Sequence, residues 1–153
     1  MSRAPQDAGE APAAVDAAPT IDWEALDRAA LAVRERAHAP YSGYWVGAAI
    51  LVRSGRVFVG CNVENASYGL AICAERSAIV QMVAAGEREP IAITVATSGP
   101  VLGSPCGMCR QTLAEFAVDL PIRLIAAGGG APPRLTSLSA LLPEAFGAAA
   151  LSR

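Results

Sequence analysis

The sequence predicts a single α/β domain, a three-layer α/β/α sandwich in which helices cover both faces of a mixed β-sheet. Short apolar runs of strand length alternate along the chain with segments whose apolar residues recur at helical spacing. The 153 residues are enough for one domain with a substantial core. Hydrophobic residues make up 53% of the chain, which is enough to supply a core and a subunit interface as well.

The predicted elements follow from capping residues, periodicity and turn signals. The first helix runs from Trp23 to about Ala37, because Asp22 is a preferred capping residue and Pro40 prevents continuation. Further on, runs of Val, Ile and Ala indicate strands, and glycines end a hairpin turn and a helix. The remaining elements are strand 46–52, turn 54–55, strand 56–61, helix 73–85 closed by Gly86, strand 91–96, helix 107–116, strand 122–126, loop 128–133 and helix 137–142. This gives the order α-β-β-α-β-α-β, followed by a short last helix.

The first twenty residues differ in composition from the rest of the chain. Residues 1–20 are mostly Ala, Pro, Asp and Glu, and they lack the charged start and apolar stretch of a secretory signal. We expect a disordered N-terminal tail over 1–20 and one folded domain over 21–153.

Charge and cysteine usage exclude several classes of function. The net charge is -2, and the twelve basic residues are all arginines without a basic cluster, so a nucleic-acid partner is not expected. No apolar run reaches the length of a membrane span, so no membrane partner is expected either. The four cysteines do not form the pattern of a secreted disulfide framework, which favours a reducing cytoplasmic location.

Three cysteines predict a zinc site. Cys73 and the Pro-Cys-x-x-Cys pair of Cys106 and Cys109 fall where two helices begin, and a helix start favours negative charge. Three thiolates leave the fourth position of a tetrahedral Zn²⁺ ion to a water molecule, as in catalytic zinc sites. Glu75 follows Cys73 by two residues, so it is predicted to handle the proton of that water.

Four further residues, Arg76, Arg110, Cys61 and His38, are candidates for a place at the site. Arg76 is predicted to hydrogen-bond the sulfurs and offset their charge, whereas Arg110 is interpreted as a helix-surface charge. Cys61 lies in a strand and is interpreted as a buried thiol, although as a fourth ligand it would make the site structural. His38, the one histidine, is interpreted as a residue at the end of a helix that faces water.

Five segments together resemble the small homotetrameric cytidine deaminases, from about Trp23 to Phe146. The segments are Ala39-Pro40-Tyr41-Ser42, Val46-Gly47-Ala48-Ala49, Cys61-Asn62-Val63-Glu64-Asn65-Ala66-Ser67-Tyr68, Cys73-Ala74-Glu75-Arg76 and Ser104-Pro105-Cys106-Gly107-Met108-Cys109-Arg110-Gln111. The resemblance implies a cytidine-deaminase-like fold with one Zn²⁺ per subunit, held by Cys73, Cys106 and Cys109. It implies zinc-dependent hydrolytic deamination of cytidine and deoxycytidine to uridine and deoxyuridine in pyrimidine salvage, with Glu75 as the acid and base.

The resemblance also implies roles in substrate binding. Asn62 and Glu64 would hold the ribose hydroxyls, and the Ala74 backbone would contact the base. Ala66 and Tyr68 would lie near the sugar in a neighbouring subunit's site, so the resemblance implies a homotetramer with shared active sites.

Two aromatic residues match the family's pocket less closely. Tyr44 stands where the family usually has Phe, and Phe146 where a C-terminal Phe reaches another subunit; either ring can stack on a base. Core packing is an equal alternative for Tyr44, and anchoring of the last helix to the core is an equal alternative for Phe146. Trp45 is bulkier than the residue common there, and Glu144 replaces a frequent Gly before Phe146.

Three alternatives remain open at this point. A deaminase of a modified cytosine nucleoside, such as the blasticidin type, resembles the chain around the cysteines but differs over residues 62–65. A nucleic-acid-editing deaminase would need basic surface, and Glu64 would repel a phosphate near the sugar. A non-catalytic zinc module would use Cys61 as a fourth ligand.

Overall fold

The computed structural model describes residues 18–147 and 150–151. The elements are α1 (Trp23–Arg34), β1 (Val46–Val52), β2 (Val57–Cys61), the 3-10 helix η1 (Tyr68–Leu70), α2 (Ala74–Ala84), β3 (Pro90–Thr97), α3 (Gly107–Ala114), β4 (Pro121–Ala126), β5 (Arg134–Ser137) and α4 (Leu138–Leu141). Among the described residues, no helix combines the length and apolar character needed to cross a bilayer. The predicted tail falls mostly on residues outside the described part of the chain, so it stays a prediction.

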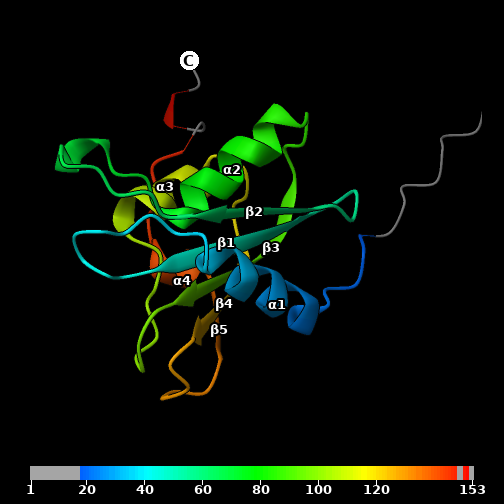
Figure 1. Ribbon diagram of the computed structural model, residues 1–153. Coiled ribbons are helices and arrows are strands. Elements are labelled where there is room, and N and C mark those ends of the chain that lie inside the picture. The colour runs from blue at the N-terminus through cyan, green and yellow to red at the C-terminus, as the bar shows by residue number, and fades with distance from the viewer. Residues whose placement is uncertain (1–17, 148–149, 152–153) are drawn as a thin grey trace, which may run out of the picture.

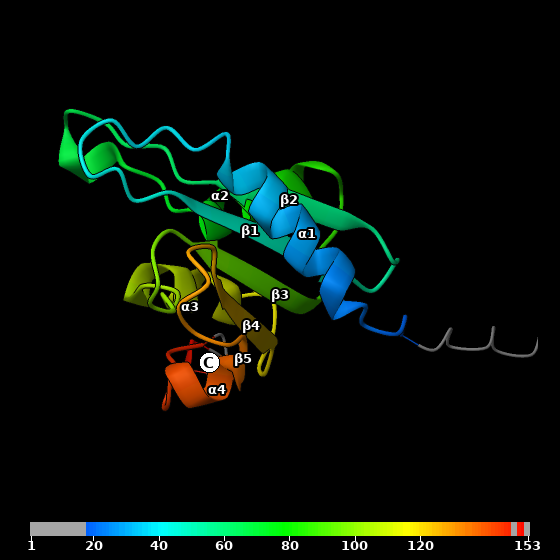
Figure 2. The same cartoon turned by 60° about the horizontal axis from the view of Figure 1, so that its bottom comes forward.

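The strands form one mixed sheet in the order β2-β1-β3-β4-β5. β1 is antiparallel to both β2 and β3, β3 is parallel to β4, and β4 is antiparallel to β5. α1 covers one face of the sheet, and α2 and α3 cover the other (Figure 1, Figure 2). The predicted three-layer architecture is therefore confirmed.

β1 is the strand that joins the two cores of the domain. Its side chains alternate between the faces, as the strand period of two requires. Ala48, Ile50 and Val52 are buried on the α2 and α3 side, whereas Ala49 and Leu51 are buried under α1. This burial on both faces explains why the sequence of β1 is one continuous apolar run.

The helix that follows β2 lies very close to the sheet. A Cβ atom at Gly60 in β2 would come within 2.5 Å of the Ala74 carbonyl oxygen at the start of α2. Only glycine therefore fits at this position, and the start of α2 is fixed against β2. Gly86, with φ of 87°, ends α2 as predicted, because a left-handed residue closes a helix.

The end of α1 and an additional strand, β5, differ from the prediction. α1 ends at Arg34 instead of near Ala37, because the Arg36 and Ala37 amides bond to carbonyls only three residues back. β5 was not predicted, and it occupies Arg134–Ser137 between the glycine-rich loop and α4. Its side chains are exposed or half-buried, so it lacks the apolar signal of an inner strand.

Candidate active site

The two zinc-ligand segments meet because of the sheet topology. β2 and β3 both run antiparallel to β1, so they are parallel to each other and end at the same edge of the sheet. β2 leads to α2 and β3 leads to α3, so both helices begin at that edge. Cys73 is the N-cap residue of α2 and Cys106 is the N-cap residue of α3, which brings residues 33 positions apart into contact.

Three cysteine sulfurs gather at this edge with the spacing of zinc ligands. The Sγ atoms of Cys73, Cys106 and Cys109 all lie within 4.8 Å of one another. The Cys73–Cys106 separation is 3.9 Å and the Cys106–Cys109 separation is 3.6 Å. Sulfur ligands about 2.3 Å from a tetrahedral zinc ion lie about 3.8 Å apart, so the group fits Zn²⁺ as arranged.

The charges at the sulfurs also suit a divalent cation. The pKa of Cys73 is lowered to about 5, because Cys109 and Arg76 stabilise its thiolate by hydrogen bonds. The pKa of Cys109 is raised by its hydrogen bond to Cys73 and by burial. The sulfurs compete for negative charge, and a shared cation removes that competition by stabilising every thiolate.

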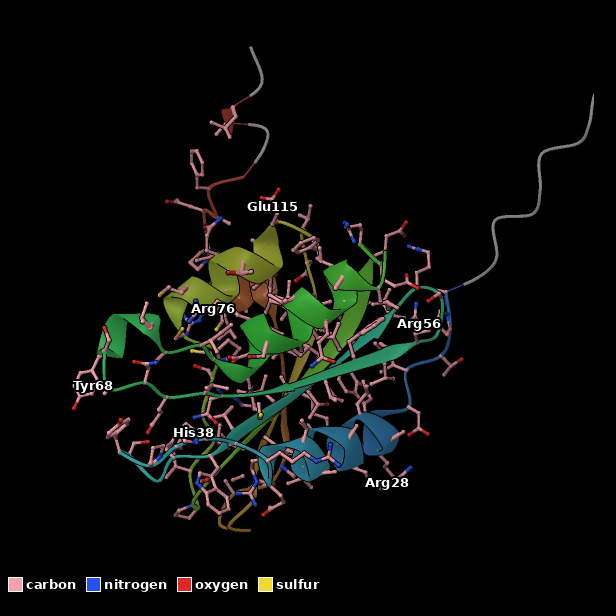
Figure 3. All side chains as sticks on the ribbon, turned by 45° about the horizontal axis from the view of Figure 1, so that its top comes forward. Arg28, His38, Arg56, Tyr68, Arg76 and Glu115 are labelled. Carbon is pink, nitrogen blue, oxygen red and sulfur yellow. The ribbon has the colours of Figure 1, made fainter. Side chains whose placement is uncertain are left out.

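Arg76 lies close to the cysteines, as predicted. Its Nη2 atom is 4.0 Å from the Cys73 sulfur and donates to the Ala71 carbonyl oxygen at 3.1 Å. Its buried Nε atom has no hydrogen-bond partner among the described residues. Figure 3 shows Arg76 between α2 and α3. Its positive charge lies next to the thiolate of Cys73.

Glu75 is buried in the first turn of α2. Only 4% of its surface is exposed, whereas helix-surface carboxylates are usually solvated. Burial raises the pKa of the Glu75 carboxyl, and the negative charge of Cys73 raises it further. Such a carboxyl accepts and holds a proton more readily than an exposed one, as a general acid and base requires.

The segment that carries Asn62 and Glu64 is bonded directly to the zinc-ligand region. Val63 and Ile72 exchange backbone hydrogen bonds at 2.9 and 3.0 Å, and Ile72 is the residue before Cys73. On its other side the segment pairs with His38, which bonds to the backbone of Asn62 and Glu64. Sequence reasoning did not foresee this link.

The side chains of Asn62 and Glu64 are held by neighbouring loops. Asn62 accepts from the Val46 amide at 2.8 Å and donates to the Tyr44 carbonyl oxygen at 2.9 Å. Glu64 accepts from the Tyr41 amide at 2.9 Å and from both the amide and the hydroxyl of Ser42. Glu64 also lines a cavity of about 290 Å³, whose other lining residues are Tyr41, Ser42, Asn65, Tyr68 and Ala71.

Tyr44 lies against the loop that leads to Cys106. A Cβ atom at Gly103 would be 2.5 Å from the Tyr44 hydroxyl, so the tyrosine ring extends toward this loop. Ala74 is buried as the first residue of α2. Tyr44, Asn62 and Ala74 therefore all belong to segments that border the cysteines.

Three other predicted substrate-binding residues are not gathered at the sulfur group. Ala66 and Tyr68 belong to a loop that projects from the body, and Tyr68 is 80% exposed at its end (Figure 3). Phe146 is 61% exposed and lines a separate cavity of about 590 Å³ beside residues 114–118, at the carboxyl end of α3. The cysteines lie at the opposite end of that helix.

The interpretation of Arg110 as a helix-surface charge is wrong. Its guanidinium donates to the Pro105 carbonyl oxygen at 2.7 Å, to the Leu141 carbonyl oxygen at 2.8 Å and to the Ser104 hydroxyl at 3.1 Å. Arg110 therefore ties the loop before Cys106 to the end of α4. Its position directly after a ligand was the one available signal.

Cys61 and His38 lie outside the sulfur group. The Cys61 thiol is half-buried and donates to the Arg36 carbonyl oxygen at 3.5 Å, and the group of ligand atoms found among the described residues does not include it. His38 is exposed, beyond the end of α1. Neither residue closes the fourth zinc position.

Comparison with known proteins agrees with this geometry. Residues 21–122 match the family model described as "Cytidine and deoxycytidylate deaminase zinc-binding region". The cytidine deaminase of Sporosarcina psychrophila is 41% identical over 129 residues, which cover 82% of this chain and 92% of that protein. The cytidine deaminase of Halalkalibacterium halodurans is 43% identical over 129 residues, covering 82% of this chain and 95% of that protein.

Solved structures show the same similarity. The crystal structure of cytidine deaminase from Burkholderia pseudomallei superposes with a TM-score of 0.77 at 47% identity, covering 82% of this chain and 100% of that chain. The crystal structure of cytidine deaminase from Mycobacterium tuberculosis superposes with a TM-score of 0.73 at 39% identity, covering 84% of this chain and 99% of that chain. With its zinc-ligand group, fold and sequence in agreement, this chain belongs to the cytidine and deoxycytidylate deaminase zinc-binding family.

Proposed function

We propose that the chain catalyses the hydrolytic deamination of cytidine and deoxycytidine to uridine and deoxyuridine in pyrimidine salvage. The observation that carries this proposal is the set of three sulfurs at zinc-ligand spacing, with Glu75 buried two residues after Cys73. Three protein ligands leave one position of a tetrahedral zinc ion for water. When bound, the zinc ion lowers the pKa of that water and supplies a nucleophile at neutral pH.

Glu75 moves the protons of the reaction. It takes a proton from the water that attacks C4 of the base and gives that proton to N3. It then takes the proton of the new C4 hydroxyl and gives it to the amino group, which leaves as ammonia as the C4–N bond breaks and the C4 carbonyl forms. A buried carboxyl with a raised pKa supports this role, because burial makes its protonated form easier to reach than that of an exposed glutamate. Arg76 offsets the negative charge of three thiolates, which would otherwise weaken the pull of the ion on water.

The nucleoside is held by residues on the segments that border the cysteines. Glu64 accepts hydrogen bonds from the ribose hydroxyls. Asn62 assists, because its two bonds to backbone leave one N–H donor and one acceptor position free. The Ala74 backbone contacts the base at the start of α2, where amide groups lack helical partners. The Tyr44 ring stacks on the base.

The exposed aromatic residues complete the sites of neighbouring subunits. Tyr68 and Phe146 expose large apolar surface far from the sulfur group of their own chain, which supports a homotetramer with shared active sites. Ala66 lies in the same projecting loop as Tyr68 and would contribute beside it. The four cysteines are free thiols, which supports a reducing, cytoplasmic setting.

Two alternatives differ in the substrate. A deaminase of the blasticidin type differs from this chain over Asn62-Val63-Glu64-Asn65, and here Glu64 is already pre-organised by Tyr41 and Ser42 to accept hydroxyl groups. A nucleotide or nucleic-acid substrate would bring phosphate toward the Glu64 carboxylate of a chain with net charge -2. Both features favour a free cytosine nucleoside.

An ultraviolet assay with cytidine, run beside zinc analysis of the same preparation, tests the proposal. We expect uridine formation in proportion to zinc content, with one zinc per chain. Blasticidin S and CMP serve as competing substrates in the same assay. A zinc-loaded preparation that leaves cytidine unchanged but deaminates either competitor would contradict the proposal.

A further inference from the structure

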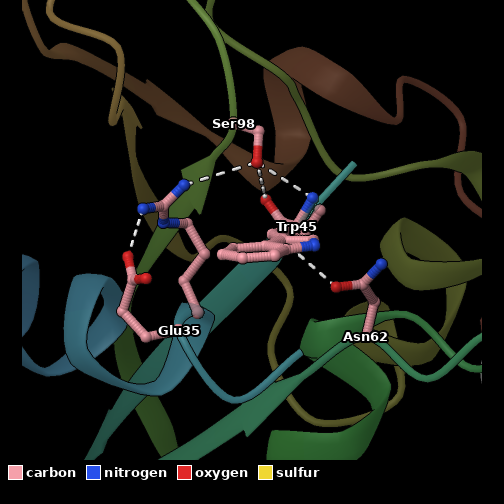
Figure 4. A network of polar contacts seen from close by, with 6 residues as sticks. Glu35, Trp45, Asn62 and Ser98 are labelled. Carbon is pink, nitrogen blue, oxygen red and sulfur yellow. Dashed lines mark hydrogen bonds and ion pairs between the residues drawn. The ribbon is translucent and has the colours of Figure 1, made fainter. Parts of the chain in front are cut away.

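The backbone of Tyr44, Trp45 and Val46 is held from both sides by side chains at the start of β1. The Ser98 hydroxyl accepts from the Trp45 amide at 2.9 Å and donates to the Trp45 carbonyl oxygen at 3.0 Å. On the opposite side, the Asn62 carboxamide bonds to the Val46 amide and the Tyr44 carbonyl oxygen. Figure 4 shows Ser98 and Asn62 on the two sides of Trp45.

These contacts extend the sheet by side chains where its backbone pairing ends. The regular pairing of β1 with β3 stops at Val46 and Thr97, and the next pair in register is Trp45 with Ser98. The Ser98 amide also donates to the Trp45 carbonyl oxygen at 2.9 Å. The hydroxyl adds a second bond to that carbonyl oxygen and one bond to the Trp45 amide, so three hydrogen bonds join the two residues instead of one.

Arg34 completes the bonding of the Ser98 hydroxyl. Its Nη1 atom donates to Ser98 Oγ at 3.3 Å, and its Nη2 atom pairs with Glu35. A hydroxyl offers one donor and two acceptor positions, and Arg34 with Trp45 uses all three. α1 can bring Arg34 this close because Gly47 has no side chain: a Cβ atom there would be 2.7 Å from the Arg34 backbone nitrogen.

The segment held in this way lies between the two halves of the site. The Tyr44 ring extends to Gly103, in the loop that leads to Cys106. Asn62 belongs to the segment that bonds through Val63 to Ile72, next to Cys73. A shift of residues 44–46 therefore displaces first the Tyr44 ring and the Asn62 carboxamide, whereas none of the three cysteines of the sulfur group is hydrogen-bonded to these residues in the described part of the chain.

We propose that Ser98 is a positioning residue that sets the nucleoside-binding side of the site by fixing Trp45, an inference that rests on the proposed function. Ser98 does not touch substrate. It acts through the backbone of residues 44–46 and through Asn62. Its loss is therefore expected to weaken nucleoside binding while leaving zinc binding and proton transfer by Glu75 intact.

Steady-state kinetics with cytidine, zinc analysis and the fluorescence of Trp45 together test the proposal. For Ser98→Ala we expect KM to rise roughly five- to thirtyfold, the equivalent of one or two hydrogen bonds. We expect kcat to stay within about twofold and zinc content to be unchanged. In a Trp23→Phe background, acrylamide should quench Trp45 more strongly after the Ser98→Ala change.

Two variants serve as controls. Ser98→Thr keeps the hydroxyl and is expected to restore wild-type KM and quenching. Ser54→Ala removes a hydroxyl that donates to Glu87 at the far end of the β1–β2 hairpin. This variant should change neither the KM for cytidine nor the quenching of Trp45. If Ser98→Ala does not fold, Arg34→Gln takes its place with the same expected direction, because it removes one of the two donors to the hydroxyl.

Unchanged KM in Ser98→Ala beside an active wild-type chain would overturn the inference and leave the proposed function standing. Increased quenching with unchanged KM would do the same, because it would show that the segment moves without affecting the nucleoside. A loss of zinc in Ser98→Ala would also overturn it, since the residue would then act on the metal side. A zinc-loaded wild-type chain without cytidine turnover would instead overturn the proposed function, and this inference with it.

Discussion

Arg110 donates its Nε–H to the Pro105 carbonyl oxygen at 2.7 Å, directly across the helix start that carries Cys106. The same guanidinium reaches the Leu141 carbonyl oxygen at the end of α4. One side chain thus connects the loop before a zinc ligand with the last helix of the chain. Among the described residues, no other side-chain hydrogen bond joins this region to α4.

Replacing Arg110 by Ala should destabilise the zinc-loaded protein by about 2–4 kcal/mol, because two carbonyl groups and a hydroxyl lose a charged donor. Urea unfolding measures the change. Arg88→Ala is the matched control, since Arg88 bonds to carbonyl groups one and five residues away on an exposed surface. Arg88→Ala should lower the free energy of unfolding by about 1 kcal/mol or less. Equal losses in the two variants would contradict the role given to Arg110.

Glu75→Gln should fold, keep one zinc per chain and lose cytidine turnover by at least about 10³-fold, because the amide cannot exchange protons. Stopped assays of kcat and zinc analysis of the same sample check this outcome. Glu115→Gln, at the exposed carboxyl end of α3, is the matched control and should retain wild-type turnover. Zinc-loaded Glu75→Gln with a retained rate would remove Glu75 from the mechanism.

Cys106 and Cys61 should behave differently on substitution. Cys106→Ala removes a member of the sulfur group and should abolish both zinc binding and turnover. Cys61→Ala removes only a weak bond to the Arg36 carbonyl oxygen, so zinc binding and turnover should both be retained. Zinc per chain, measured on purified protein, decides between them. Loss of zinc from Cys61→Ala would revive the structural-site alternative.

Glu64 should make the enzyme prefer a nucleoside to a nucleotide. We expect kcat/KM for cytidine to exceed that for CMP by at least about tenfold, because the carboxylate repels phosphate near the sugar. Glu64→Gln should raise KM for cytidine and narrow the gap to CMP. Competition assays with the two substrates give the ratio directly. If CMP is processed as fast as cytidine, Glu64 does not face the sugar.

The pH dependence of KM should report the ionisation of Glu64. The pKa of its carboxyl is lowered, because the Ser42 hydroxyl and the Tyr41 amide donate to it. The carboxylate therefore stays ionised as the pH falls through the ordinary glutamate range, and KM should rise only below that range. Ser42→Ala removes the largest cause, so the rise in KM should begin at a higher pH. Zinc content at each pH separates this effect from loss of metal.

The sequence was sufficient for the layers of the fold and for the metal ligands. The continuous apolar run of Val46–Val52 identified the central strand, and Gly86 marked the end of α2. Their residue type and their spacing identified Cys73, Cys106 and Cys109 as zinc ligands, because few combinations of residues suit zinc. These signals are local in the chain, so one sequence reveals them.

Features that depend on distant partners were missed. Arg134–Ser137 forms a strand because its backbone pairs with the free edge of β4. Its own side chains are exposed or half-buried, so they give no strand signal in the sequence. Arg110 donates to a carbonyl oxygen 31 residues further along the chain, and Ser98 is hydrogen-bonded to Trp45, 53 residues before it. Backbone carbonyl groups are present at every position, so no residue type marks which one a side chain will bind.

The paired backbone of Val63 and Ile72 limits how this enzyme can be redesigned. Changing residues 62–65 to accept other sugars will also disturb the backbone hydrogen bonds of Val63 with Ile72, the residue directly before Cys73. A change in sugar preference is therefore coupled to zinc retention through Ile72, which lies between the paired segment and the ligand Cys73. Libraries aimed at new nucleosides will keep their cofactor more often when they vary side chains at fixed loop length than when they insert or delete residues.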